Sequence, residues 1–419
     1  MTLQRGSSPF KQDEVLTEGW EPEDIVGRDN ELGQIEEVLQ QVIDAEAPIN
    51  SLLYGFSGTG KTACMEYKLA ELEASAKNYD DLNVETVYQN CDGLNSSYQV
   101  AVALANQMLP ESEQLPKSGL AQDDVFERLF KQIDALGTES DDITDYVVIV
   151  LDEIDNVGSK DRIIYQLPRA KDMGRVEDVR LCAIGISNEI AYKEKLNADS
   201  ESSFRQKDIT FKKYTAGQLE KILWQRAEKA FKPGAIDESA IRRSSAVAAK
   251  LGGDARYALD LLHKAGIKAK SNGDDVVSDS HVEIAQEEKE RDRISEVIDD
   301  LSKHEKLTLA ALVYEELEGN APIKRNELYP RYKEFASSLL REVNVNRRIA
   351  DYLKDMAHLS LIDRTDAFKG PGESGFKYEM NKASYEVVLR SLMNTTIDDD
   401  TGATLLPEKL SNAYDNLSS

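Results

Sequence analysis

The sequence predicts a three-layer α/β domain with a parallel sheet, followed by a helical domain and a winged helix. Strand-like apolar runs alternate with helical patterns over residues 50–211, and no strand pattern follows for about 75 residues. From residue 291 the pattern becomes three helices and a hairpin. Alternating strands and helices are typical of a parallel sheet covered on both faces, which binds ligands at the carboxyl ends of its strands. The expected segments are a flexible tail at 1–20, the α/β base at 21–211, the helical domain at 212–290, the winged helix at 291–395 and an acidic tail at 396–419.

A glycine-rich loop follows the first apolar run of the base. Residues 55–62 read Gly-x-x-x-x-Gly-Lys-Thr, and a helical pattern comes next, which is the context of a phosphate-binding P-loop. Glycines let consecutive backbone N–H groups converge on phosphate oxygens, and the helix N-terminus adds its dipole. We expect Lys61 to reach the β- and γ-phosphates and Thr62 to hold Mg²⁺. The residues expected to bind nucleotide are Gly55, Ser57, Gly58, Thr59, Gly60, Lys61 and Thr62.

Two carboxylates follow a later apolar run. Residues 146–151 form a continuous β-rich stretch, typical of a strand covered on both faces, and Asp152 and Glu153 come directly after it. Asp152 can hold Mg²⁺ together with Thr62, and Glu153 can polarise the attacking water. The alternative, an acidic turn after a strand, is disfavoured by the P-loop upstream. The pair therefore predicts hydrolysis of a nucleoside triphosphate.

Two further polar residues fit the same site. A strand pattern at 179–186 ends just before Asn188, whose amide would face the γ-phosphate or the attacking water. In the helical domain, Asp254 is placed to cap a helix, which leaves Arg256 in the first turn. The helix dipole disfavours a cation there, so the position invites an anion such as a nucleotide phosphate. A turn-forming role for Asn188 and a surface ion pair for Arg256 are the alternatives.

The charge of the chain is uneven. Its 419 residues include 77 acidic and 51 basic ones, a net charge of −26. Such a surface repels nucleic acid but suits a cytoplasm of high salt, where the Debye length is only about 3 Å at 1 M. Residues 291–390, with 17 basic and 18 acidic side chains, are nearly neutral. Scattered cysteines and the absence of a secretory pattern or an 18-residue apolar run predict a cytoplasmic protein without membrane contact.

The winged-helix region is the part suited to DNA. Helical patterns at 307–317 and 324–335 precede a third helix that Asn346 could cap, with Arg347 and Arg348 facing outward. Two strand patterns, at 359–364 and 376–380, enclose a glycine-rich tip. Such a module places its third helix in the major groove and its wing on the backbone or minor groove. A winged helix used only for protein contact is the alternative.

Together these motifs resemble the archaeal initiator family related to the origin recognition complex and the cell-division-control helicase loader. The matching stretches are residues 26–32, 55–62, 90–91, 151–155, 185–188 and 253–260. The family consists of AAA+ ATPases that bind replication origins, and the resemblance runs over residues 22–390. It implies ATP or ADP with Mg²⁺ as ligands, sensor roles for Asn188 and Arg256, and a helical lid at 212–290.

The resemblance also implies further contacts. The adenine pocket is expected near Val26, Gly27 and Arg28, and an added helix between residues 98 and 120 is expected to contact DNA. The winged-helix contacts with DNA are expected at Arg347, Arg348 and Lys377, and Lys324, one of the basic residues concentrated in 321–350, is a further expected contact.

The chain departs from the family in two places. Glu201 stands where the family has a basic residue, so activation by an arginine finger from a neighbouring subunit would have to use Arg205, in a different register. The wing tip offers Lys369 and Glu373 where the family is rich in arginine.

The function expected is that of an ATP-dependent initiator that recognises origin DNA and hydrolyses ATP slowly, as a switch. Its expected partners are double-stranded origin DNA, other initiator subunits and the replicative helicase. One alternative is a paralogous regulatory ATPase that acts on transcription, a plasmid origin or another initiator. The other is a signalling NTPase whose winged helix binds protein.

Overall fold

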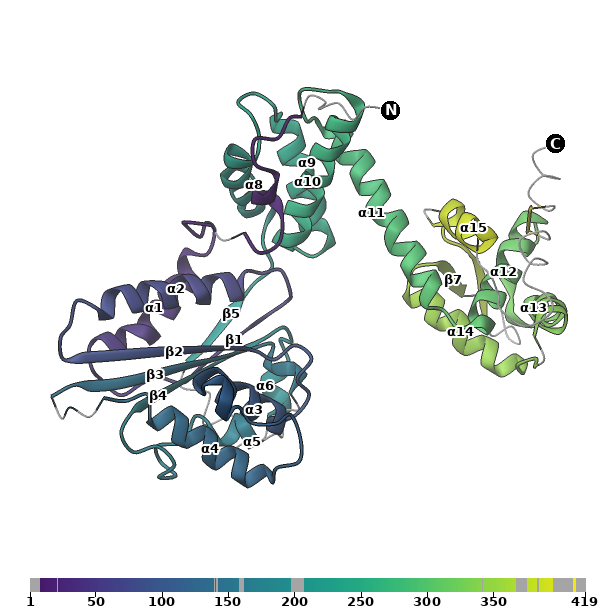
Figure 1. The fold of residues 1–419 in the computed structure, drawn as a ribbon. Coiled ribbons are helices and arrows are strands. Elements are labelled where there is room, and N and C mark those ends of the chain that lie inside the picture. Colours follow the sequence, from purple (N-terminus) through teal and green to yellow (C-terminus); the bar gives the residue numbers. More distant parts are fainter. Residues whose placement is uncertain are drawn as a thin grey trace. The chain divides into compact units, whose positions relative to one another are not determined.

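The computed structural model describes residues 8–20, 22–138, 140, 142–157, 162–196, 207–340, 342–366, 375–382, 384–394 and 410–411 (Figure 1). The chain divides into two compact units, Met1–Glu283 and Ile284–Ser419. Each unit is described by itself. The first contains the α/β base and the helical lid, and the second contains the winged helix.

The base is built on the parallel sheet that the sequence predicts. Its strands are β1 (Ser51–Gly55), β2 (Leu82–Asn90), β3 (Thr144–Asp152), β4 (Arg180–Ser187) and β5 (Lys207–Phe211), in the order β2-β3-β4-β1-β5. All four pairings are parallel, and Asn90 lies beside Asp152 in the register of β2 and β3. The carboxyl ends of the strands therefore meet at one edge of the sheet, together with the P-loop that follows β1.

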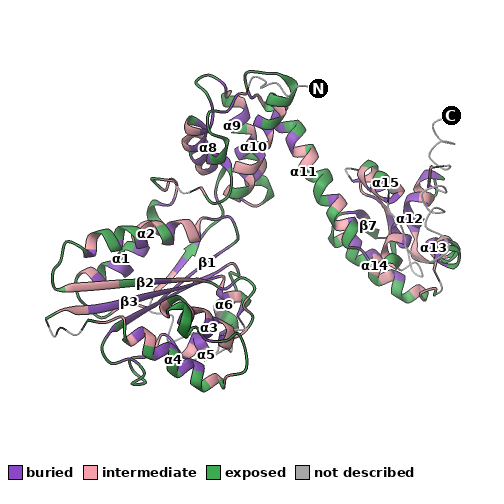
Figure 2. Cartoon of the chain, in the orientation of Figure 1, coloured by how far each residue is buried: buried purple, intermediate pink, exposed green. Residues whose placement is uncertain are grey.

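Helices cover both faces of this sheet (Figure 1). One face carries α1 (Asp29–Ile43) and α2 (Lys61–Ala76), and the other carries α3 (Ser97–Met108), α4 (Gln122–Asp134), α5 (Arg162–Gln166) and α6 (Tyr192–Lys195). Strand β3 serves both cores, because Val148 packs with α1 and α2 whereas Val147 packs with α3 and α4. Burial on both faces explains the unbroken apolar run that the sequence shows at 146–151. Figure 2 shows the resulting buried band along β3.

The helical lid consists of α8 (Ala216–Ala230), α9 (Glu238–Leu251) and α10 (Ala255–Asn272). Side chains cap the starts of all three helices: Thr215 and Gln218 form a capping box, and Asp237 and Asp254 accept backbone N–H groups. The predicted cap at Asp254 is thus confirmed. The next helix, α11 (Asp279–Asp300), begins in the first unit and ends in the second, so the expected lid boundary at residue 290 falls inside a helix.

Residues 8–20 are packed against the lid, and the expectation of a flexible tail is wrong for them. The Phe10 ring stacks on Phe231 with centroids 4.9 Å apart, and Lys11 N–H donates to the oxygen of Ala230. Val15 and Leu16, in the short 3-10 helix η1 (Asp13–Leu16), are buried as well. A few apolar side chains are enough to hold this otherwise polar segment in place, because the lid supplies the apolar surface on which they pack.

This packing predicts a stability effect. Phe10→Ala should lower the free energy of unfolding by about 3 kcal/mol, because it removes a buried ring and leaves a cavity between the segment and the lid. Denaturant unfolding in molar KCl measures the change. Tyr79→Ala is the matched control, since that ring is 47% exposed and its loss should cost no more than about 0.5 kcal/mol. Equal effects of the two substitutions would contradict the packing.

The second unit is the predicted winged helix. It contains α12 (Lys303–Leu317), α13 (Arg325–Leu339), α14 (Asn346–His358) and α15 (Tyr385–Asn394), with an antiparallel sheet in the order β6-β8-β7. The strands are β6 (Ile323–Lys324), β7 (Ile362–Asp366) and β8 (Phe376–Met380). The prediction that Asn346 caps α14 is wrong. Asn346 is the first helical residue after Val345, and its amide donates to Asn326 Oδ1 at 2.9 Å.

Candidate functional site

The P-loop turns through two glycines in the left-handed region. Gly58 has φ of +69° and Gly60 has φ of +87°, and α2 starts directly afterwards at Lys61. Side chains would also collide there. A Cβ on Gly58 would lie 1.9 Å from a carboxylate oxygen of Asp254, and one on Gly60 would lie 2.6 Å from the Tyr214 hydroxyl oxygen. The predicted need for glycine therefore comes both from the turn and from the side chains of Asp254 and Tyr214, which lie close to the loop.

Lys61 is the first residue of α2 and is 4% exposed. Its Nζ donates to the backbone oxygens of Gly55 and Phe56 and to Asn188 Oδ1, each at 2.9 Å. Burial lowers the pKa of Lys61 to about 8, against the opposing effect of the Asp152 carboxylate. Two neutral carbonyls and an amide are weak partners for a buried ammonium, so phosphate oxygens would be better ones.

The Asp152 side chain contacts the Thr62 side chain, as the sequence predicts for a magnesium site. The Thr62 hydroxyl donates to Asp152 Oδ2 at 2.7 Å. A hydroxyl and a carboxylate are hard oxygen ligands, and Mg²⁺ is commonly held by one or two such groups plus phosphates and waters. The donor chemistry of this pair therefore fits Mg²⁺.

Tyr88 is a residue of this site that the sequence analysis missed. Its hydroxyl donates to the same Asp152 Oδ2 at 2.5 Å. Burial, and next the Asp152 charge, raise the pKa of Tyr88, so the hydroxyl stays a donor. The available signal was its place two residues before the end of β2, the strand beside the one that carries Asp152.

Glu153 has an unusual backbone. Its φ of +54° places a non-glycine residue in the left-handed region, directly after β3. Its Oε2 accepts a hydrogen bond from the Asn156 amide at 3.2 Å. Strain of this kind is often found at functional sites, where the surrounding fold holds it in place. Asp155 Oδ1 accepts the backbone N–H of Asn188 at 2.9 Å, which ties the ends of β3 and β4 together.

A pocket of about 1060 Å³ brings most of the predicted residues together. Its lining includes Lys61, Glu153 and Asn188 from the base and Arg256 from the first turn of α10. The expected P-loop residues Gly58, Gly60 and Thr62 line it, whereas Gly55, Ser57 and Thr59 do not. Trp20, from the segment that was expected to be flexible, is also part of the lining.

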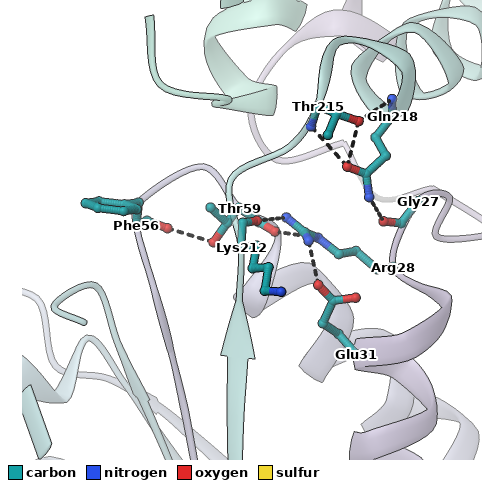
Figure 3. Close-up of polar contacts among 8 residues, drawn as sticks. All are labelled: Gly27, Arg28, Glu31, Phe56, Thr59, Lys212, Thr215 and Gln218. Carbon is teal, nitrogen blue, oxygen red and sulfur yellow. Dashed lines mark hydrogen bonds and ion pairs between the residues drawn. The ribbon is translucent and has the colours of Figure 1, made fainter. Parts of the chain in front are cut away.

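The expected adenine contacts divide. Val26 lines the pocket, but Gly27 and Arg28 do not. Arg28 is 1% exposed, and its guanidinium is turned away into contacts with Thr59, Glu31 and Lys212 (Figure 3). The Arg28 side chain is therefore engaged by three acceptors outside the pocket, while Val26, two residues earlier, keeps the expected adenine position at the lining.

A second group of predicted residues lies in the winged helix. Arg347 and Arg348 are exposed in the first turn of α14. Lys324 and Lys377 are paired across β6 and β8, so two cations share one end of the small sheet. Lys369 and Glu373 of the wing tip, and Glu201 and Arg205, lie outside the described residues. Among the residues that are described, no helix is long and apolar enough to cross a membrane.

Comparisons with known proteins agree with this architecture. Family models match in three consecutive parts: an AAA ATPase domain at 24–176, a Cdc6 AAA+ ATPase-type lid domain at 220–287, and a CDC6 C-terminal winged helix domain at 296–389. The ORC1-type DNA replication protein 11 of Haloarcula marismortui is 36% identical over 403 residues, which are 96% of this chain and 94% of that protein. The ORC1-type DNA replication protein 10 of Halobacterium salinarum is 32% identical over 91% of each chain.

A solved structure extends the likeness to three dimensions. The ORC1 protein of Aeropyrum pernix, determined in complex with DNA, is 33% identical and has a TM-score of 0.71, over 92% of this chain and 97% of that one. CDC6P from Pyrobaculum aerophilum, 19% identical with a TM-score of 0.57 over 92% of this chain and 99% of that one, shares the fold. With its base, lid and winged helix matched in order and close relatives along nearly its whole length, the chain belongs to the ORC1-type family of AAA+ ATPases.

Proposed function

We propose that this protein is a replication initiator of the cytoplasm that recognises origin DNA under the control of bound ATP. The observation that carries the proposal is the shared pocket, in which Arg256 of the lid faces the same space as Lys61 and Asn188 of the base. A γ-phosphate there could interact with base and lid at once, so ATP and ADP would favour different arrangements of the two. Relatives named as ORC1-type replication proteins, and one solved in complex with DNA, support the biological role.

Five lining residues, together with Asp152, which is bonded to Thr62 but is not itself part of the lining, have parts in binding or hydrolysis. Lys61 would leave its carbonyl partners and bind β- and γ-phosphate oxygens, and Thr62 and Asp152 would hold Mg²⁺. Mg²⁺ bound there would neutralise charge on the phosphates. Glu153 would orient the attacking water and accept its proton, and Asn188 would position that water or the γ-phosphate. Arg256 would stabilise the negative charge from the lid side.

Glu153→Gln should separate binding from hydrolysis. The substitution removes the proton acceptor but keeps the size of the side chain, so the rate of phosphate release should fall by at least about 100-fold. The Kd for ATP should change by less than about threefold, because Glu153 meets the water rather than the phosphates. Phosphate-release and titration measurements on the same preparation test both parts. A variant that hydrolyses ATP at the normal rate would remove Glu153 from the proposed role.

On the DNA side, the proposal assigns the contacts to Arg347, Arg348, Lys377 and Lys324. The exposure of the two arginines and the pairing of the two lysines support it. Helix α3 is the candidate for the added DNA contact of the base, and other initiator subunits and the replicative helicase are the proposed protein partners. A footprint on DNA that flanks the gene of this protein tests origin recognition. Protection of repeated sites supports it, and uniform binding to unrelated DNA contradicts it.

One observation favours a second candidate function. Several distinct ORC1-type proteins from Haloarcula marismortui, numbered 1, 2, 11 and 15, match this chain at 30 to 36% identity. A family with many copies in one organism has room for a paralogue that regulates transcription, a plasmid origin or another initiator. Mapping the genomic sites that the protein occupies in cells distinguishes the two. Sites beside replication origins support initiation, and sites at promoters alone support regulation.

A further inference from the structure

The guanidinium of Arg28 is buried where three segments of the first unit meet (Figure 3). One segment is the start of α1, where Arg28 itself is the N-cap residue. The second is the P-loop. The third is the linker of residues 212–215, which joins β5 of the base to α8 of the lid. Arg28 is thus in contact with the phosphate-binding loop and with the connection about which the lid would move.

Arg28 donates to each of these segments in a different direction. Its Nε donates to the backbone oxygen of Thr59 in the P-loop at 3.0 Å, and Nη2 donates to the backbone oxygen of Lys212 at 2.6 Å. Its Nη1 forms an ion pair with Glu31 at 2.6 Å. A rigid planar fork with five N–H donors can hold three such acceptors, whereas the single ammonium of lysine cannot reproduce the geometry. Glu31 balances the buried charge, and the two carbonyl bonds join the P-loop to the linker.

Further contacts connect the linker to the P-loop. The Arg28 guanidinium lies 3.7 Å from the centre of the Tyr214 ring, and the Tyr214 hydroxyl is the group that leaves no room for a Cβ on Gly60. The Lys213 ammonium lies 4.3 Å from the centre of the Phe56 ring. Every linker residue from 212 to 214 therefore contacts the P-loop directly or through Arg28.

The lid also forms hydrogen bonds with the segment that carries Arg28 and with the P-loop. In the first turn of α8, Gln218 Nε2 donates to the backbone oxygen of Gly27 at 2.9 Å, next to Arg28 (Figure 3). At the start of α10, the Ala255 N–H donates to the backbone oxygen of Gly58 at 3.0 Å. Arg256 follows Ala255 directly. A rotation of the lid would therefore have to stretch the Arg28 contacts or move the P-loop with it.

We infer that Arg28 is a positioning residue for the nucleotide. By bonding to Thr59 and to Lys212 at once, it fixes the angle at which the lid presents Arg256 to phosphates held by the P-loop. Arg28 does not line the pocket, so it acts through the backbone of these two residues. The inference rests on the proposed nucleotide site and adds to it a mechanical connection that sets the preference for ATP over ADP.

Arg28→Lys tests the connection, because it keeps the charge beside Glu31 and loses the fork. Titration with ATP·Mg²⁺ and with ADP·Mg²⁺ gives the ratio of the two affinities, which should fall about tenfold, as for loss of an ordinary coupling between sites. Hydrolysis at saturating ATP should slow by a similar factor. If Arg28 is needed only for stability, Arg28→Lys will lower the melting temperature and leave the affinity ratio unchanged. That result would overturn the inference.

Glu31→Gln is the matched control. It disturbs the same buried cluster and removes the ion pair, but it leaves the bonds of Arg28 to the Thr59 and Lys212 oxygens in place. The melting temperature should fall, while the ratio of ATP to ADP affinity should stay within about twofold of the original. If Glu31→Gln changes the ratio as much as Arg28→Lys does, the ratio depends on the buried charge pair and not on the bonds of Arg28 to the Thr59 and Lys212 oxygens. The inference then fails.

Gln218→Glu provides a test that does not depend on a buried substitution. A glutamate at this position keeps the capping box, since its oxygen can still accept from Thr215 N–H as Gln218 Oε1 does at 3.0 Å. It cannot donate to Gly27, so one tie between lid and base is lost. The affinity ratio should fall about threefold, a smaller effect than that of Arg28→Lys; an unchanged ratio would overturn the inference. If the unaltered protein binds neither ATP nor ADP, the proposed function itself is wrong, which distinguishes that outcome from a failure of the inference about Arg28.

Discussion

Lys61→Ala is expected to abolish measurable ATP binding. The buried ammonium is held by neutral oxygens only, so its charge is available to the β- and γ-phosphates, and losing two charge-assisted contacts costs about 3–5 kcal/mol. That corresponds to a Kd raised by roughly 100-fold to more than 1000-fold. Titration with ATP·Mg²⁺ in molar KCl measures the change.

Lys68→Ala is the control for this result. Lys68 lies on the same helix, two turns further along, and forms ion pairs with Glu36 and Glu71 rather than lining the pocket. Lys68→Ala removes the same charge from α2 as Lys61→Ala does. Because Lys68 does not line the pocket, the Kd of this variant for ATP should stay within about twofold of the original. A Lys61→Ala variant that is folded and binds ATP as tightly as this control would rule out the proposed phosphate site.

The second large effect is expected on DNA. The double substitution Arg347→Ala and Arg348→Ala should weaken duplex binding by about 10- to 100-fold at moderate salt and leave ATP binding intact. Two lost phosphate contacts should also reduce the slope of log K against log salt by about 2. Binding to duplex DNA over a series of KCl concentrations gives both quantities, and the high-salt end should show the smaller difference.

A charge-matched control is available in the same unit. Arg291 on α11 and Arg390 on α15 border one small cavity and form ion pairs with Glu287 and Glu386. Replacing both by alanine removes the same net charge as the test variant but should change duplex affinity less than about threefold. If both double variants lose affinity equally, the effect comes from overall charge and α14 is not the recognition helix.

Features encoded within a few residues could be predicted from the sequence. The P-loop, the Asp152–Glu153 pair and the cap at Asp254 each depend on local spacing, and the parallel sheet then places their elements at one edge. The same reasoning placed Arg347 and Arg348 on the exposed side of a helix, because Ile349 and Leu353 supply its buried side.

Features that depend on distant partners could not be predicted. The contacts of Arg28 join it to residues 31 and 184 positions away, whereas the resemblance to the initiator family had suggested only that it lies near the adenine pocket. The Tyr88 hydroxyl meets a carboxylate 64 residues further along. The packing of residues 8–20 likewise depends on Phe231 and Arg226 of the lid, which no local pattern reveals.

The central claim is that a nucleotide in the pocket of the first unit governs how the second unit binds DNA. The most direct measurement is the Kd of the full chain for origin duplex in molar KCl, with ATP·Mg²⁺, with ADP·Mg²⁺ and without nucleotide, using Glu153→Gln to keep the ATP state. We expect the ATP and ADP states to differ at least about fivefold, the lower end of an ordinary coupling between two sites. Equal affinities in all three conditions, with nucleotide binding shown in the same samples, would contradict the account.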